Sequence, residues 1–174
     1  MERITVFTPT YNRRQSLTRV FESLQKQTYR DFNWIIVDDG SKDDTKSLID
    51  EFIVKADFKI IYIYQENAGK HSAINRGLKE TTSELFLIAD SDDSFKENAL
   101  EIFINTLEER SQYKGVIAKC YNAEDGTPIG SYPQHMFDSN DLDAYFRLRL
   151  CFEKWNIVRT DIMKEIPFPE PNEK

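Results

Sequence analysis

Leu85-Phe86-Leu87-Ile88-Ala89-Asp90-Ser91-Asp92-Asp93 is the stretch that restricts the fold most, because a short apolar run ends in three carboxylates. The apolar residues 85–89 have the length and composition of a buried strand. Carboxylates about 4 Å apart repel by roughly 1 kcal/mol in water and by more near a protein surface. Such a cluster needs water, hydrogen-bond donors or a cation. A divalent metal that carries a phosphate ligand would supply the missing charge.

Strand-like and helix-like patterns alternate around that stretch. The predicted strands are residues 4–8, 34–37, 60–63 and 85–89, and the predicted helices have apolar residues at helical spacing within 17–24, 48–53, 70–82 and 100–107. Pro9 is expected to end the first strand because it cannot donate to a ladder, and Ser94 to Glu97 has the spacing of a capping box for the last helix. The alternation predicts an α/β fold with right-handed βαβ units. Near-continuous apolar strands predict a mostly parallel sheet with helices on both faces.

The pattern is less regular after Gly115. We expect strands over 116–121 and 155–158, a turn at 125–128 and a helix over 142–150, and we expect no regular element at the proline-containing end, 167–174. The sequence has no internal repeat or low-complexity linker. A length of 174 residues with 40% hydrophobic residues predicts a single globular domain.

Composition excludes several classes of protein. The formal charge of −7 disfavours a nucleic-acid partner. Two cysteines outside any C-x-x-C spacing provide neither a disulfide framework nor a zinc signature, which favours a cytoplasmic protein. The sequence shows no apolar leader and no run of about 20 apolar residues, so we expect a soluble protein. Peripheral association with the inner face of a membrane stays open.

Four segments follow predicted strands and should converge on one edge of the sheet, where open α/β sheets bind ligands. They are residues 8–13, 38–41, 65–71 and 90–93. Taken alone, Asp38-Asp39-Gly40-Ser41 also fits an ordinary strand-to-helix turn. Beside a second acidic cluster, these carboxylates suit a nucleoside, whose ribose hydroxyls and base N–H groups are donors. Lys70 or His71 would lie near a phosphate, although Asn67, Gly69 and Lys70 also fit a turn with a solvated charge.

Six segments carry a resemblance to a known family. They are Thr8-Pro9-Thr10-Tyr11-Asn12, Gln27-Thr28-Tyr29, Asp38-Asp39-Gly40-Ser41, Asn67-x-Gly69-Lys70, Ala73-x-Asn75-x-Gly77 and Asp90-Ser91-Asp92-Asp93. Their order, spacing and strand context resemble the signature of family two nucleotide-sugar glycosyltransferases with the Rossmann-like GT-A fold. The resemblance covers nearly all of residues 4–107 and, weakly, 153–168. It implies a nucleotide-binding half over 1–110 and part of an acceptor-side half over 111–174.

The resemblance also implies roles for individual residues. The donor site would comprise Pro9, Tyr11, Asn12, Asp38, Asp39, Asn67, Lys70, His71, Asp90, Ser91 and Asp92. Asp38 and Asp39 would hold the base and ribose, while Lys70 and His71 would border the base or phosphates. Asp92 is the expected direct ligand of Mg²⁺ or Mn²⁺, with Asp90 nearer the ribose or a metal-bound water.

The family resemblance predicts an inverting transfer from a nucleoside-diphosphate sugar, most commonly UDP-linked, to a hydroxyl of a glycan, lipid-linked or other acceptor. An Asp or Glu that acts as general base normally follows a segment resembling Ile166-Pro167-Phe168-Pro169. Glu170 and Glu173 do not form a recognisable version of that motif. We therefore expect the base to lie beyond Lys174, in a longer enzyme, or the chain to bind the donor without full catalysis.

Two alternatives stay open at this point. One is a nucleotide-sugar binding module without turnover. The other is a haloacid-dehalogenase-like phosphatase, in which Asp90 would be the nucleophile and Asp92 the acid of a D-x-D-x-S motif, although its later motifs have no match. An EF-hand is excluded because Phe95 replaces the required glycine, and a dinucleotide-binding domain because no G-x-G-x-x-G follows the first strand.

Overall fold

The structure is a computed structural model that describes residues 2–130, 138–139 and 154–169. Its elements are β1 (Ile4–Thr10), α1 (Arg14–Gln25), β2 (Phe32–Asp38), α2 (Thr45–Lys55), β3 (Lys59–Tyr64), α3 (Lys70–Glu80), β4 (Leu85–Ile88), α4 (Ala99–Glu109), β5 (Gly115–Lys119), β6 (Lys154–Arg159) and α5 (Thr160–Glu165). The chain forms two compact units, 1–116 with 157–174, and 117–156. The predicted helix over 142–150 lies outside the described residues.

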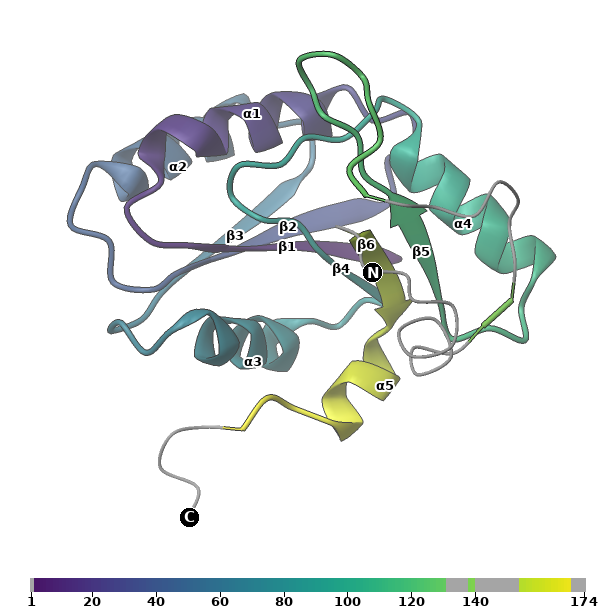
Figure 1. The fold of residues 1–174 in the computed structure, drawn as a ribbon. Coiled ribbons are helices and arrows are strands. Elements are labelled where there is room, and N and C mark those ends of the chain that lie inside the picture. The colour runs from purple at the N-terminus through teal and green to yellow at the C-terminus, as the bar shows by residue number, and fades with distance from the viewer. Residues whose placement is uncertain (1, 131–137, 140–153, 170–174) are drawn as a thin grey trace. The chain divides into compact units, whose positions relative to one another are not determined.

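The sheet confirms the predicted α/β architecture. Its strand order is β3-β2-β1-β4-β6-β5, and β1 to β4 are all parallel, while β6 runs antiparallel to β4. Helices α1 and α2 lie over one face of the sheet and α3 and α5 over the other (Figure 1). The sheet is therefore mostly parallel and covered on both faces, as the apolar strands predict.

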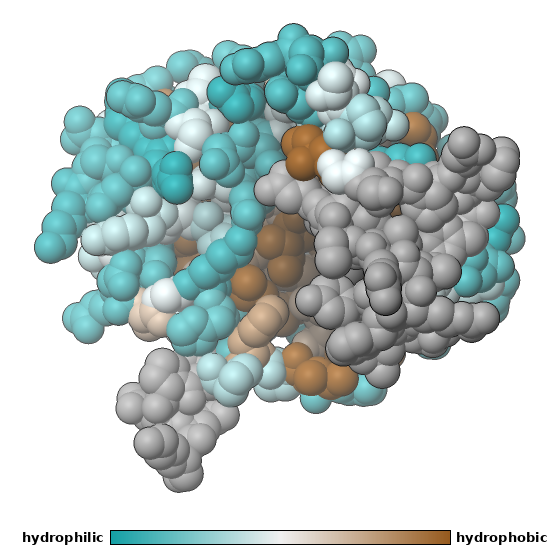
Figure 2. Space-filling view, viewed as in Figure 1, coloured by the Kyte–Doolittle hydropathy of each residue, from teal (hydrophilic) through white to brown (hydrophobic). Residues whose placement is uncertain are grey.

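The face beneath α1 and α2 has an aromatic core. Phe21 of α1 stacks on Phe52 of α2 with ring centroids 4.1 Å apart, and Trp34 of β2 lies 6.4 Å from Phe21. The buried apolar side chains of α1 recur at helical spacing, which confirms the predicted amphipathic helix: Leu17, Val20, Phe21 and Leu24. The outer surface over these helices is mostly hydrophilic (Figure 2). Burial of each large apolar side chain contributes about 1.5–3 kcal/mol before conformational entropy is counted.

The opposite face packs against α3. Ala73, Ile74 and Leu78 of α3 share a core with Phe7 and Phe86, whose rings stack at 5.2 Å. A Cβ at Gly77 would lie 2.1 Å from the Phe7 ring, so the helix can approach β1 only with glycine at this position.

Strand β1 does not end at Pro9, as the sequence predicts, but continues to Thr10. The carbonyl of Phe7 accepts from the Ala89 N–H, whereas the carbonyl of Thr10 accepts from the Asp39 N–H. Because hydrogen-bonding direction alternates along a strand, Pro9 faces the β4 side, beyond the last β1–β4 pair, Phe7 and Ile88. A donor is not required there, and proline is tolerated within the strand.

Two further differences concern helices. The predicted capping box is wrong, because α4 begins after Asn98 and has no side-chain cap of its own. Residues 94–97 instead belong to a loop whose Glu97 carbonyl accepts from the Thr28 N–H at 2.8 Å. The sequence also misses α5, which lacks an amphipathic repeat long enough to recognise in six residues.

In the second unit, the predicted turn at 125–128 lies within a hairpin. Tyr121 and Pro128 form an antiparallel bridge, and the Asn122 N–H donates to the Thr127 carbonyl at 2.8 Å. The Thr127 N–H in turn donates to the Asp125 carboxylate at 2.9 Å.

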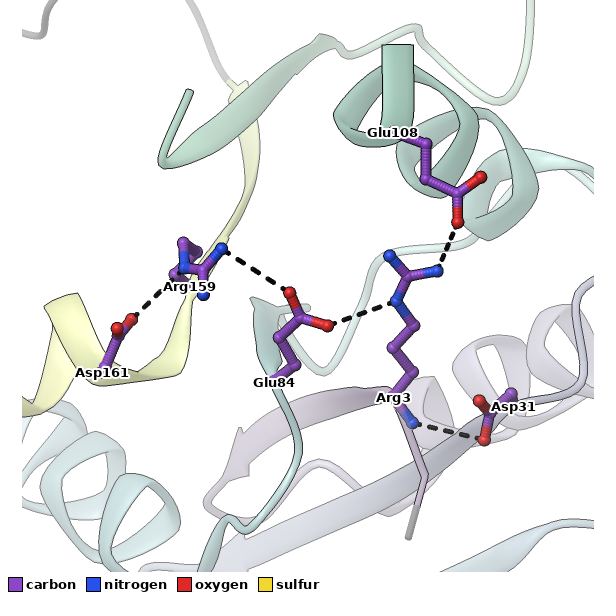
Figure 3. A network of polar contacts seen from close by, with 6 residues as sticks. All are labelled: Arg3, Asp31, Glu84, Glu108, Arg159 and Asp161. Atoms are coloured by element: carbon purple, nitrogen blue, oxygen red, sulfur yellow. Dashed lines mark hydrogen bonds and ion pairs between the residues drawn. The ribbon is translucent and has the colours of Figure 1, made fainter. Parts of the chain in front are cut away.

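A network of charged side chains joins the amino ends of the parallel strands (Figure 3). Arg3, before β1, contacts Glu84 at 3.3 Å and Glu108 of α4 at 2.5 Å. Glu84 also lies 3.7 Å from Arg159, which in turn lies 3.7 Å from Asp161. The hydrogen bond from Arg3 to Glu108 raises the pKa of the arginine despite its partial burial. This network ties α4, β6 and α5 to the end of the sheet opposite the predicted site.

Candidate functional site

The loops after β1, β2, β3 and β4 all leave the carboxyl ends of parallel strands, and they are hydrogen-bonded to one another there. The Asp39 N–H donates to the Thr10 carbonyl at 2.8 Å, and the Gln65 N–H donates to the Asp38 carbonyl at 2.9 Å. Parallel strands therefore bring the four predicted segments to one edge, where such sheets bind ligands.

Asp38 is almost fully buried, with 1% of its surface exposed. One carboxylate oxygen accepts from the Ser41 N–H at 2.8 Å and the other from the Tyr62 hydroxyl at 2.9 Å. Burial of Tyr62, together with its bond to the Asp38 carboxylate, raises the pKa of its phenol well above the usual range. Asp38 thus fixes the turn after β2 and orients Tyr62 of the neighbouring strand.

Asp39 joins the loop after β2 to the loop after β3. Its Oδ1 accepts from the Gln65 side chain at 2.7 Å and from the Ala68 N–H at 2.9 Å, and its Oδ2 accepts from the Gly69 N–H at 2.8 Å. Asp39 is 4% exposed. Charge-assisted bonds of this kind are about twice as strong as neutral ones, so the carboxylate holds the start of α3 in place.

Gly40 permits the close approach of these two loops. It has a φ of +86°, and a Cβ there would lie 2.9 Å from the backbone nitrogen of Asn67. The Asn67 side chain donates to the Asp39 carbonyl at 2.9 Å. Any larger residue at position 40 would strain the backbone and push the Asn67 segment away.

Asn12 and Ser41 join the loops after β1 and β2. The Asn12 N–H donates to the Ser41 hydroxyl at 2.8 Å, and the Lys42 N–H donates to the Asn12 side-chain oxygen at 2.8 Å. Asn12 adopts a φ of +51°, a left-handed conformation that asparagine tolerates better than most residues. The predicted pocket residue Asn12 therefore shapes this edge through its backbone and its amide oxygen.

Asp43 connects the starts of two helices. Its carboxylate accepts from the N–H of Arg14, the first residue of α1, at 3.3 Å and from the N–H of Thr45, the first residue of α2, at 3.2 Å. Asp43 is exposed, and the slight desolvation of its carboxylate opposes ionisation, but these bonds and the Thr45 hydroxyl outweigh that effect and lower the pKa of the carboxyl. Asp43 satisfies donors that a helix start leaves unpaired.

Lys70 connects the start of α3 to the acidic cluster. Its ammonium group lies 2.6 Å and 2.9 Å from the two carboxylate oxygens of Asp90. Gly69, directly before the helix, has a φ of +94°, and a Cβ there would lie 2.9 Å from the His71 ring. The positive end of the α3 dipole and the Lys70 charge are thus adjacent to the loop after β4.

The loop after β4 presents its acidic residues in different ways. The Asp93 carboxylate accepts from the Asp90 N–H at 3.1 Å, while Ser91 is buried and Asp92 is exposed. The Asp92 carbonyl accepts from the Arg19 guanidinium at 3.3 Å. Within residues 2–130, 138–139 and 154–169, no three His, Cys, Asp or Glu side chains are grouped closely enough to hold a metal ion.

The remaining predicted residues differ in accessibility. Pro9 is buried within β1, Tyr11 is 45% exposed, Asn67 is exposed and His71 is half-buried. Sequence reasoning did not assign Tyr62, Gln65, Ser41 or Arg19 to the site. Gln65 lies in the predicted segment 65–71 after a strand, so its position was a signal for the site. Tyr62 lies within the predicted strand 60–63, and its sequence position indicates only a strand residue.

Comparison with known proteins identifies the family and the fold. The family model described as "Glycosyl transferase family 2" matches residues 5–167. The chain belongs to glycosyl transferase family 2. Its six-stranded sheet with flanking helices is the GT-A fold, as the resemblance implies.

Two curated relatives and one solved structure illustrate the family's range. The chain is 35% identical over 125 residues to "Glycosyltransferase GlyG" of Streptococcus pneumoniae, covering 71% of this chain and 41% of the relative. It is 35% identical over 123 residues to "Teichoic acid poly(glycerol phosphate) polymerase" of Staphylococcus epidermidis, covering 70% of this chain and 17% of the relative. S. aureus TarS 1-349 in complex with UDP matches with a TM-score of 0.72 and 27% identity, over 97% of this chain and 50% of that chain.

The chain thus spans half or less of the length of each of these family members. Among the helices that the structure describes, none is long and apolar enough to cross a membrane.

Proposed function

We propose that this chain binds a nucleoside-diphosphate sugar, UDP-linked in the first instance, and takes part in transferring the sugar to an acceptor hydroxyl with inversion. The proposal rests on membership of glycosyl transferase family 2 and on one structural observation. Asp39 binds the start of α3, and Lys70 of the same helix reaches Asp90. Three strand-end loops are thereby joined around the positive end of a helix, which favours a phosphate group.

Each loop has a chemical role in this proposal. The buried pair Asp38 and Asp39 sets the pocket for base and ribose by fixing the loops after β2 and β3. The exposed Tyr11 offers an aromatic surface beside that pocket. Lys70 and the N-terminal turn of α3 stabilise the diphosphate, and Asn67 and His71 border it.

The acidic residues fit a divalent ion bound together with a nucleotide. Asp92 is exposed and Asp90 half-buried, and both offer hard carboxylate oxygens of the kind that Mg²⁺ and Mn²⁺ prefer. Because the described residues hold no group of three metal-binding side chains, diphosphate oxygens and water would complete the coordination. When bound, the ion would act as a Lewis acid that stabilises the departing nucleoside diphosphate.

The acceptor side is proposed on the relatives alone. The polymerase relative is named for a teichoic acid, a polymer rich in hydroxyl and phosphate groups, and a TarS structure contains UDP-GlcNAc. We therefore propose a cell-surface polysaccharide or a lipid-linked glycan as the acceptor class. The base that removes the acceptor proton is not assigned to a described residue.

Calorimetric titration with UDP, with and without Mn²⁺, tests the proposal directly. We expect binding that strengthens with Mn²⁺ in the intact chain and loses that strengthening in Asp92→Ala. Asp50→Ala, which removes an exposed carboxylate on α2 that pairs with Lys46, serves as the matched control and should bind like the unmodified chain.

Parallel titrations with GDP and dTDP, and with Mg²⁺, identify the nucleotide. Absence of binding for all three nucleotides with both metals would refute the proposal. Incubation with the corresponding sugar nucleotides then separates an enzyme from a binding module, because only an enzyme releases the nucleoside diphosphate.

A further inference from the structure

The segment Gln27-Thr28-Tyr29 belongs to the family signature, yet no role in the site accounts for it. It joins α1 to β2, and Gln27 is buried, with 3% of its surface exposed. A buried glutamine is uncommon unless its amide is fully hydrogen-bonded.

The amide group of Gln27 bridges α1 to the start of α4. Its Nε2 donates to the Ser23 carbonyl at 3.0 Å and to the Lys96 carbonyl at 2.8 Å, and its Oε1 accepts from the Leu100 N–H at 3.1 Å. Both amide hydrogens and the oxygen are thus used. Because α4 has no cap from its own loop, Gln27 supplies the acceptor that a neighbouring N-cap residue normally provides.

Thr28 and Arg19 add further bonds to the same loop. The Thr28 N–H donates to the Glu97 carbonyl at 2.8 Å, and the Thr28 hydroxyl donates to the Glu101 carboxylate at 2.8 Å. The Arg19 guanidinium donates to the Asp92 carbonyl at 3.3 Å. All of these donors come from α1 or the turn that follows it.

Residues 89–98 form no helix or strand, so bonds to the rest of the fold determine their course. At one end, the Ala89 N–H donates to the Phe7 carbonyl in the sheet. At the other end, Gln27 and Thr28 hold Lys96, Glu97 and Leu100. Asp92 lies between these two anchored ends.

We propose that Gln27 is a positioning residue that holds the Asp92 loop in the conformation needed for metal-dependent binding of the donor diphosphate. It acts through the loop backbone and touches neither nucleotide nor metal. Because its amide is shielded from water, loss of its bonds leaves the buried Leu100 N–H without this acceptor and removes the link between α1 and the Lys96 carbonyl, which frees the loop. The inference rests on the proposed donor site and adds a residue that supports it.

The experiment compares Gln27→Met with Asn33→Leu, a matched control. Asn33 is also 3% exposed and its side chain bonds Thr5, Ser83 and Glu2, but it lies at the amino end of β2, away from the acidic loop. Both substitutions replace a buried amide with an apolar side chain of similar size. A purely structural role predicts that both lower the free energy of unfolding and leave the effect of Mn²⁺ unchanged.

Calorimetry measures UDP affinity with and without Mn²⁺ for each variant. The ratio of these two affinities is the Mn²⁺-dependent gain, and it decides between the two roles. We expect Gln27→Met to lower the Mn²⁺-dependent gain in UDP affinity by about tenfold, as loss of outer-shell support for a metal site commonly does, and Asn33→Leu to leave it within about twofold. UDP affinity without metal should change little in either variant. Hydrogen exchange of residues 91–98 should accelerate only in Gln27→Met.

Several outcomes would overturn the inference. One is a folded Gln27→Met variant with the same Mn²⁺-dependent gain as the intact chain; another is an equal loss in Asn33→Leu. If Gln27→Met does not fold, Gln27→Glu keeps an acceptor for the Leu100 N–H but loses the donor to the Lys96 carbonyl; it should lower the gain, and no change in a folded Gln27→Glu variant refutes the idea. Failure of the intact chain to bind UDP with Mn²⁺ refutes the proposed function instead.

Discussion

The ammonium group of Lys70 lies between the two carboxylate oxygens of Asp90, 2.6 Å from one and 2.9 Å from the other. The pair is exposed, with 57% of the lysine side chain and 47% of the aspartate side chain accessible. Such a pair contributes at most about 1 kcal/mol to folding. The pair joins the start of α3 to the loop after β4, where the proposed donor diphosphate would bind.

Replacement of Lys70 by Met should therefore change two affinities in opposite directions. Affinity for Mn²⁺ alone should rise about threefold to tenfold, because a positive charge beside the acidic loop is removed. Affinity for UDP with Mn²⁺ should fall, because the diphosphate loses a cation. Calorimetry of each ligand measures both effects.

Lys79→Met, at the last turn of the same helix, is the control and should alter neither affinity. Lys70→Arg keeps the charge and should behave more like the intact chain than Lys70→Met does. A parallel fall of both affinities in Lys70→Met would contradict the prediction.

Asp39→Asn should destabilise the fold and weaken UDP binding. Three donors converge on this carboxylate, from Gln65, Ala68 and Gly69, whereas an amide offers one oxygen and turns its own N–H groups toward donors. We expect the free energy of unfolding to fall by about 1.5–3 kcal/mol, measured in urea. Asp50→Asn, on the exposed side of α2, should change it by less than about 0.5 kcal/mol. Equal urea midpoints for Asp39→Asn and the intact chain would show that the bonds contribute little.

Glu84→Gln should lower stability in a manner that depends on salt. Glu84 bridges Arg3 and Arg159 at the amino ends of the strands (Figure 3). Because these side chains are partly exposed, we expect a loss of about 1 kcal/mol at low ionic strength and a smaller loss in about 1 M NaCl. UDP binding should be unchanged, since the network lies at the other end of the sheet. A loss that salt does not reduce would exclude an electrostatic origin.

Tyr62 should make stability depend on alkaline pH. Burial and the bond to Asp38 raise the pKa of its phenol above the value of about 10 in an unfolded chain. Below pH 10 the phenol is neutral in both states and its contribution is complete. As the pH rises above 10, the unfolded chain loses the proton first, so stability falls until the pH reaches the raised pKa of the folded state.

Tyr62→Phe isolates this effect from other groups that titrate in the same range. The difference in unfolding free energy between the intact chain and Tyr62→Phe should be largest below pH 10 and shrink above it. At neutral pH the substitution should cost about 1.5–3 kcal/mol, because a hydrogen bond to a buried carboxylate is lost. A constant difference from pH 8 to pH 11 would contradict the raised pKa.

Local patterns along the chain were enough to predict most of the fold. The apolar run in 34–37 and the helical spacing from Leu17 to Leu24 predict β2 and α1, and the alternation of such segments predicts a parallel sheet covered on both faces. These features depend on which side chains avoid water within a few residues of one another, which the sequence states directly. The sequence also predicted the family, because six short motifs occur in the order expected for it.

Features that depend on distant partners could not be read in the same way. A capping box at Ser94 to Glu97 has the right spacing, but α4 starts later because Gln27, more than seventy residues earlier, bonds the Leu100 N–H. The antiparallel direction of β6 likewise depends on its pairing with β4 and not on its own residues.

The acidic residues show the same division within the site. Their place after strands is a property of the sequence, and it predicts that they meet at one edge. The bonding and exposure state of each carboxylate is not a property of the sequence alone. Asp39 is buried and accepts from three donors, Asp90 is paired with Lys70, and Asp92 is exposed. Those states follow from which donors the folded loops bring within about 3 Å, a distance that depends on the packing of α1 and α3 against the sheet.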